Sequence, residues 1–172
     1  PSVDWGDFDK DGDLDILMTG KYDDGSDEID YLTKIYINNG DMQFSNYEHN
    51  LTHVSNGDAK WADFDNDGDL DIALLGNTNE SFVYVCEIYE NVNGQFQNLN
   101  IDLTGLRYGQ VQWGDYDNDN DLDVFFNGSY DLDQPSISII LQNNGDGSFS
   151  ETELMQIGTR QGDSKWVDLD SD

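Results

Sequence analysis

Acidic side chains recur at alternate positions in a nine-residue segment that appears four times in the sequence, the last time incompletely. The clearest copy, residues 63–71, has aspartate at positions 1, 3, 5, 7 and 9 and Gly68 at position 6. Carboxylate and carbonyl oxygens are the ligands that Ca²⁺ prefers, and a glycine at position 6 permits the sharp turn that wraps a chain around the ion. We expect position 7 to bind through its backbone carbonyl. The segment is therefore predicted to be a Ca²⁺ loop.

The predicted ligands are all aspartates, and each copy is expected to hold about one Ca²⁺ ion. Mg²⁺ prefers rigid, water-rich octahedral sites and Zn²⁺ prefers Cys and His, so both suit these loops less well. In the third copy, Asn120 replaces the glycine, and asparagine tolerates the left-handed backbone better than most residues do. The candidate metal ligands are Asp7, Asp9, Asp11, Asp13, Asp15, Asp63, Asp65, Asp67, Asp69, Asp71, Asp115, Asp117, Asp119, Asp121, Asp123, Asp168, Asp170 and Asp172.

Charge repulsion gives the physical reason for a cation in these loops. Each pair of carboxylates about 4 Å apart costs roughly 1 kcal/mol in water and about 4 kcal/mol near a protein surface. One such segment could also be a solvated acidic turn, because Asp and Gly are good turn formers. Four copies in a fixed register favour metal sites instead.

The overall charge limits the possible partners. The 172 residues include 37 Asp and Glu but only 7 Lys and Arg, a net charge of −30. The loops hold 18 of these 37 acidic residues, five in each of the first three copies and three in the fourth. Nucleic acid and anionic membrane surfaces would be repelled, and no apolar stretch approaches the length of a membrane span. We therefore expect no nucleic-acid partner and no membrane insertion.

The loops belong to a longer repeat. A tryptophan lies two residues before the first aspartate of each loop, at Trp5, Trp61, Trp113 and Trp166, with spacings of 56, 52 and 53 residues. An Asn-Gly pair followed by an aromatic residue recurs later in each complete unit. Two landmarks in register indicate a true repeat. We divide the chain into repeats at residues 1–54, 55–108 and 109–161, followed by the start of a fourth at residues 162–172.

Each unit is predicted to form four short strands, which in the second unit are residues 58–64, 70–75, 82–89 and 96–103. The pair Asn93-Gly94 is a hairpin turn signal between the last two. Residues 82–89 are apolar on both faces, which is typical of a sheet packed between other sheets, and their Cys86 is expected to be a buried small hydrophobe. The predicted class is all-β. The units are expected to be consecutive four-stranded antiparallel blades of a β-propeller, three blades and the start of a fourth, or an open array of such blades.

The pattern Trp-x-Asp-(Phe/Tyr)-Asp-x-Asp-Gly-Asp-Leu-Asp, with the later Asn-Asn-Gly element, resembles the FG-GAP/VCBS repeat of integrin α-subunit propellers and many bacterial secreted proteins. The resemblance covers essentially the whole chain. It implies propeller blades, usually seven, with Ca²⁺ bound between the first two strands of a blade, in an extracellular or cell-surface protein. Asn120 departs from the pattern, which puts the third site in doubt. Seven units would need about 370 residues at this period, so we expect a piece of a longer protein or of a larger assembly.

Three functions are compatible with this sequence. The first is a Ca²⁺-binding extracellular module with a non-catalytic role in adhesion or in binding a protein or glycan ligand. The second is a structural building block of a long surface filament, whose partners are further repeats of the same chain or other copies of it. The third, an accessory domain of a secreted polysaccharide-degrading enzyme, has less support, because the carboxylates are already assigned to metal loops and no catalytic arrangement is evident. His49 and His53 are expected to have surface or packing roles.

Overall fold

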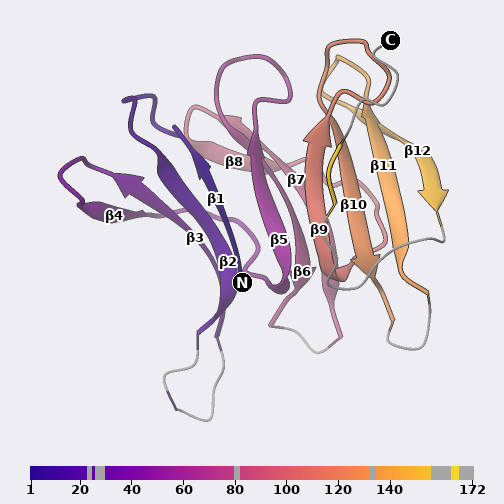
Figure 1. The fold of residues 1–172 in the computed structure, drawn as a ribbon, viewed down its shortest axis with the longest axis horizontal. Coiled ribbons are helices and arrows are strands. Elements are labelled where there is room, and N and C mark those ends of the chain that lie inside the picture. Colours follow the sequence, from indigo (N-terminus) through magenta and orange to yellow (C-terminus); the bar gives the residue numbers. More distant parts are fainter. Residues whose placement is uncertain (23–24, 26–29, 80–81, 132–134, 156–163, 167–172) are drawn as a thin grey trace.

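The computed structural model describes residues 1–22, 25, 30–79, 82–131, 135–155 and 164–166. These residues form strands, turns and irregular segments without any helix, so the predicted all-β class is confirmed. The strands make three four-stranded antiparallel sheets that stand side by side (Figure 1). Each sheet is a simple meander, and none of the three closes on itself, as expected for propeller-like blades in an open array.

The strands of each sheet follow one another in the chain. The first sheet contains β1 (Ser2–Gly6), β2 (Asp15–Tyr22), β3 (Asp30–Asn38) and β4 (Phe44–Tyr47). The second contains β5 (Ser55–Ala62), β6 (Asp71–Asn77), β7 (Tyr84–Val92) and β8 (Gln95–Asn98). The third contains β9 (Arg107–Gly114), β10 (Asp123–Ser129), β11 (Ile137–Asn143) and β12 (Phe149–Met155).

The predicted strand at residues 82–89 is displaced in the structure. The strand β7 begins at Tyr84, and Phe82 lies before it with 88% of its surface exposed. The amide of Thr78 donates to the carbonyl of Val83 at 3.0 Å, and Phe82 adopts a positive φ of 63°. Phe82 therefore belongs to the connection between β6 and β7, and the prediction that its side chain lies in the buried strand was wrong. Its hydrophobicity gave no sign of this turn.

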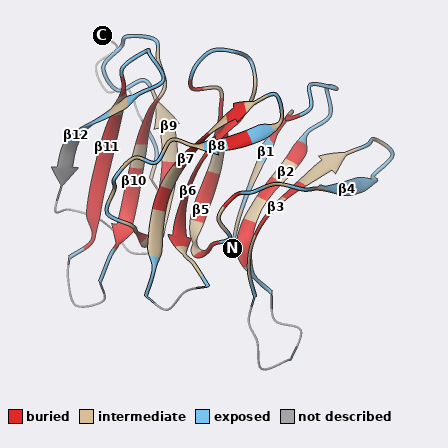
Figure 2. Cartoon of the chain, turned by 180° about the vertical axis from the view of Figure 1, so that it is seen from behind, coloured by how far each residue is buried: buried red, intermediate tan, exposed pale blue. Residues whose placement is uncertain are grey.

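The core lies in two layers between neighbouring sheets (Figure 2). In β7, Cys86 and Ile88 pack in the layer shared with the third sheet, whereas Tyr89 packs in the layer shared with the first. The middle sheet is thus buried on both faces, as its apolar sequence predicts. Cys86 is buried, as expected, and burial raises the pKa of its thiol far above the ordinary value.

An aromatic contact joins each repeat to the next. The second residue of each loop packs on the tryptophan of the following repeat, with ring centroids 5.5 Å apart for Phe8 and Trp61 and 6.0 Å apart for Phe64 and Trp113. Both of these pairs are stacked. Such pairs contribute roughly 0.5–1.5 kcal/mol beyond the area they bury. The tryptophan that marks each repeat in the sequence therefore packs that repeat against the one before it.

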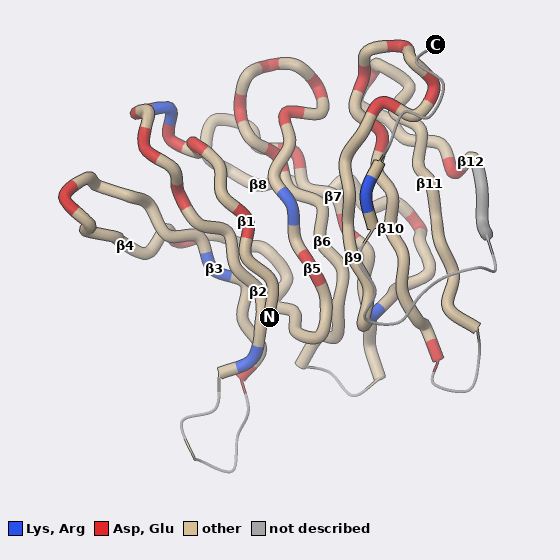
Figure 3. Tube along the Cα trace, in the orientation of Figure 1, with Lys and Arg blue, Asp and Glu red and all other residues tan. Residues whose placement is uncertain are grey.

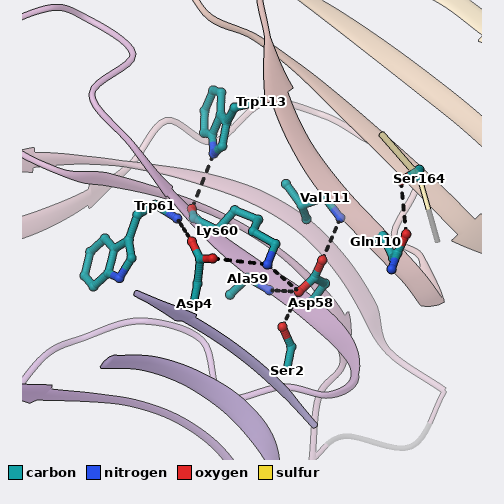
Figure 4. A network of polar contacts seen from close by, with 10 residues as sticks. All are labelled: Ser2, Asp4, Asp58, Ala59, Lys60, Trp61, Gln110, Val111, Trp113 and Ser164. Carbon is teal, nitrogen blue, oxygen red and sulfur yellow. Dashed lines mark hydrogen bonds and ion pairs between the residues drawn. The ribbon is translucent and has the colours of Figure 1, made fainter. Parts of the chain in front are cut away.

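A buried carboxylate ties the first strands of the three sheets together (Figure 4). Asp58 on β5 accepts hydrogen bonds from the Ser2 hydroxyl on β1 and from the Val111 amide on β9, the latter at 3.1 Å. On β1, Asp4 accepts from the amide of Trp61 at 3.0 Å. Two of these bonds satisfy main-chain donors, the amides of Val111 and Trp61, and all three join residues of different repeats. They therefore help to fix the register of one repeat against another.

A bulge at the start of the first strand explains two glycines. The register of β5 against β6 shifts between Ser55 and Asp58, and a Cβ on Gly57 would lie 1.9 Å from the carbonyl oxygen of Leu75. A Cβ on Gly109 would lie 1.7 Å from the carbonyl oxygen of Asn127. No side chain can be accommodated at such distances, so glycine is required where the two strands approach.

Candidate metal centre

Three of the four predicted loops are described, and they connect the first two strands of their sheets. Loop one is residues 7–15, loop two is residues 63–71 and loop three is residues 115–123. All three lie along the same edge of the stack, where the acidic residues gather (Figures 1 and 3). The fourth loop, with Asp168, Asp170 and Asp172, lies outside the described residues.

Each loop is closed by hydrogen bonds from its own backbone to its own carboxylates. In loop two, the Gly68 amide donates to Asp63 Oδ2 at 3.0 Å, and the Asp69 amide donates to Asp67 Oδ1 at 2.7 Å. Loops one and three repeat both bonds. Position 6 has φ of 94° and 89° at the two glycines and 75° at Asn120, so asparagine adopts the conformation that the turn requires.

Position 9 is the buried anchor of each loop. Asp71 is 1% exposed, and its two oxygens accept from the amides of Phe64 at 3.0 Å and Asn91 at 2.8 Å. Asp15 and Asp123 make the same pair of bonds. Burial raises the pKa of Asp71 from its ordinary value to about 7, although both hydrogen bonds lower it. The anchor therefore connects the start of the loop to the end of the third strand.

The structure adds an asparagine that the sequence analysis missed. Asn91 donates through Nδ2 to the carbonyl of Leu70 at 3.1 Å, while its own Oδ1 accepts from the Gly94 amide at 2.7 Å. Asn38 and Asn143 make equivalent bonds in the other two sheets. The side chain thus joins the acidic loop to the hairpin that follows the third strand. Its recurrence two or three residues before each hairpin glycine was the available signal.

Only some of the predicted ligands come together through their side chains. In each loop the carboxylates of positions 1, 3 and 9 have oxygens that lie within 4.8 Å of one another. The side chains of positions 5 and 7 are not part of these clusters. At position 5, Asp67 and Asp119 instead accept a hydrogen bond from the backbone amide of position 7. The three clusters consist of Asp7, Asp9 and Asp15; Asp63, Asp65 and Asp71; and Asp115, Asp117 and Asp123.

Two oxygen atoms show that the clusters suit a cation. Asp7 Oδ1 and Asp63 Oδ1 are buried and have no hydrogen-bond donor. A buried carboxylate oxygen without a partner is costly, and three carboxylates in contact repel one another. A hard divalent cation with oxygen ligands removes both costs, and Ca²⁺ prefers this donor set. The position 1, 3 and 9 carboxylates would hold the ion, which would offset their negative charge.

Loop three differs from the other two in its hydrogen bonds. Both oxygens of Asp115 are engaged, by the amides of Asp119 and Asn120 at 3.1 Å each. The Gln142 amide group also donates to Asp117 Oδ2. The residues aligned with Gln142 in the first two sheets are Ile37 and Glu90, neither of which can donate in this way. In loop three, protein groups therefore donate hydrogen bonds to carboxylate oxygens whose equivalents in loop one, such as Asp7 Oδ1, have no donor.

Neighbouring loops touch each other. The Lys10 ammonium of loop one lies 2.5 Å from Asp69 Oδ1 of loop two, and Asn66 Nδ2 of loop two lies 3.3 Å from Asp121 Oδ1 of loop three. The hydrogen bond to Asp69 raises the pKa of Lys10, so this side chain stays charged. The three loops thus form a continuous row in which position 4 of one loop contacts position 7 of the next.

A row of four-stranded antiparallel sheets, each with an acidic loop at the same edge, defines a β-sheet repeat protein. A model of the FG-GAP-like repeat matches residues 7–74 and again residues 63–126, and both matches begin at position 1 of a loop. The chain belongs to the FG-GAP-like repeat family. No curated protein matches the chain. Among the described residues, no helix is long and apolar enough to cross a membrane.

Proposed function

We propose that this chain is a Ca²⁺-binding repeat module with a non-catalytic role in adhesion or in binding a protein or glycan ligand outside the cell. The observation that carries the proposal is the carboxylate triad repeated in three loops, two of which bury an oxygen that has no donor. Membership in the FG-GAP-like family adds support, because such repeats are typically binding or structural modules of extracellular proteins. Extracellular Ca²⁺ modules have dissociation constants of roughly 10⁻⁴–10⁻³ M.

The direct test compares two aspartates of loop two. Asp63→Ala removes a cluster carboxylate, and Asp69→Ala removes a position 7 side chain that lies outside the cluster. Because alanine keeps the backbone carbonyl, calorimetric titration should show a loss of one Ca²⁺ site in the first variant, whereas the second variant should keep the site. Chelator should lower the melting temperature of the parent, since an ion that binds only the folded state stabilises it.

Two results would contradict the proposal. Equal losses from both variants would mean that the coordination is different from the one assigned here. A melting temperature that chelator leaves unchanged at low and at moderate salt would mean that the loops are solvated acidic turns.

A second function, as a building block of a longer array or filament, is favoured by the exposed face of the first sheet. Trp5 is 55% exposed, whereas Trp61, its equivalent in the second sheet, is 8% exposed beneath Phe8. Val3 on the same strand is 48% exposed. An exposed apolar face that matches a buried interface between repeats is suited to another repeat, from the same chain or from another copy.

Light scattering on residues 1–172 tests this second function. We expect assemblies larger than a monomer, and Trp5→Lys should shift them toward monomer because it places a charge where the rings would stack. A monodisperse, cooperatively folding parent monomer would refute it. Fusion of another FG-GAP-like repeat before Pro1 should also abolish assembly, because it covers the face that carries Trp5.

A further inference from the structure

One of the few basic residues of the chain extends from loop one to loop two. Lys10 Nζ lies 2.5 Å from Asp69 Oδ1, and a Cβ built on Gly68 would lie 3.7 Å from the same nitrogen. The side chain of Lys10 is about half exposed and that of Asp69 about a quarter exposed. Repeat one therefore places a fixed positive charge at the rim of the loop of repeat two.

The equivalent contact between loops two and three carries no charge on the donor. Asn66 occupies the position of Lys10 and donates to Asp121 at 3.3 Å. The backbone at this position is the same in both loops, with φ of 64° at Lys10 and 61° at Asn66. The two contacts thus share their placement and differ in charge.

The acceptor in each contact is outside the carboxylate triad of its loop. Loop two clusters Asp63, Asp65 and Asp71, and Asp69 is not among them. Lys10 can therefore remain paired with Asp69 while the triad holds an ion. The negative charge of Asp63, a member of the triad, helps to raise the pKa of Lys10, so the ammonium is close enough to repel a divalent cation bound by the triad.

We propose that Lys10 is a built-in counter-ion of loop two, which stabilises the metal-free loop and lowers its affinity for Ca²⁺. The inference rests on the proposed binding of Ca²⁺ by these loops. Without the ion, Lys10 offsets part of the negative charge of the loop. With the ion bound, the same ammonium opposes binding, because it repels a second cation held in the same loop. Position 4 of one repeat thus tunes the metal site of the next.

The chain itself supplies the matched substitution, because asparagine stands at position 4 in loops two and three. Lys10→Asn removes the charge and keeps a residue that accepts the left-handed backbone. Lys10→Arg keeps the charge, and Asn66→Lys introduces it beside loop three. The amide resonances of Gly12, Gly68 and Asn120, all at position 6, report loops one, two and three separately in an NMR titration with CaCl₂.

Lys10→Asn should tighten Ca²⁺ binding at loop two roughly three- to tenfold at low salt, with a smaller change at loop one. Asn66→Lys should weaken loop three by a similar factor, and Lys10→Arg should leave loop two unchanged. The differences should shrink in 1 M salt, where the screening length is about 3 Å. In chelator, Lys10→Asn should lower the melting temperature, and saturating Ca²⁺ should remove or reverse this loss.

The possible failures are distinguishable. If the parent binds no Ca²⁺, the proposed function itself is wrong. If Ca²⁺ binds but Lys10→Asn leaves the affinity of loop two unchanged, Lys10 is a structural ion pair only and the inference falls while the function stands. A shift at Gly12 as large as that at Gly68 would mean that Lys10 acts on its own loop, which also overturns the inference.

Discussion

Substitution of Asp58 tests whether the repeats are joined by the buried polar network. Asp58 accepts hydrogen bonds from the amides of Val111 at 3.1 Å and Ala59 at 3.0 Å. Asp58→Ala leaves both amides without this partner. These two residues are 0% and 1% exposed, so both amides depend on the carboxylate for a hydrogen-bond partner. Each buried donor left unsatisfied costs about 1–3 kcal/mol. We expect the free energy of unfolding to fall by about 3 kcal/mol, which in a chain of this size lowers the melting temperature by about 6–12 °C.

The assay is urea unfolding followed by tryptophan fluorescence, with Ca²⁺ saturating so that the loops remain in one state. Asp102→Ala is the matched control, because Asp102 is exposed and lies between the second and third sheets in the chain. It should change the free energy of unfolding by less than about 0.5 kcal/mol. Asp58→Asn, which retains one acceptor oxygen, should fall between the two. If Asp58→Ala unfolds within about 0.5 kcal/mol of the parent, the network does not join the repeats and the reasoning fails.

Two further predictions concern the metal loops. Burial raises the pKa of Asp71 to about 7, so the folded protein keeps a proton that the unfolded chain loses near the ordinary pKa of 3.8. In chelator, the free energy of unfolding of the parent relative to Asp71→Asn should therefore fall as pH rises from about 4 to about 7. This stability is fully present below the unfolded pKa; parallel curves for parent and variant in urea titrations across this range would contradict the assignment. Gln142→Ala should tighten Ca²⁺ binding at loop three roughly threefold, because it frees an oxygen of Asp117. Unchanged binding, measured through the Asn120 amide, would mean that this contact does not compete with the ion.

Much of the fold follows from the sequence, because the signals are local and repeated. The tryptophans and the Asn-Gly pairs predict the period, and the apolar run that contains Cys86 and Ile88 correctly predicts a middle sheet buried on both faces. Strand ends are harder, because they depend on where the pairing of two strands stops. Phe82 shows this, since an aromatic residue next to a strand has the same hydrophobicity whether it continues the strand or, as here, stands in the turn.

The sequence predicts where the acidic clusters lie, but it does not predict which of their carboxylates converge. The alternation of aspartates places five carboxylates in loop two, but the spacing alone does not say which of them converge. The convergence of Asp63 and Asp65 with Asp71 depends on the amide of Asn91, which is 20 residues away from Asp71 and is brought to it by the pairing of β6 with β7. A partner supplied by a neighbouring strand cannot be read from the loop sequence.

The aromatic contact between repeats bears on how such chains change in length. Phe8 belongs to the first repeat and its partner Trp61 to the second, and the same division recurs at Phe64 and Trp113. A duplicated segment that begins anywhere in the repeat and ends one period later therefore supplies one aromatic residue and one tryptophan, and every new boundary is formed by the same pair of side chains. Gain or loss of whole periods leaves no contact without its partner, whereas gain or loss of half a period leaves a ring exposed. Chains built in this way can lengthen or shorten by recombination in steps of one repeat without a new interface having to arise.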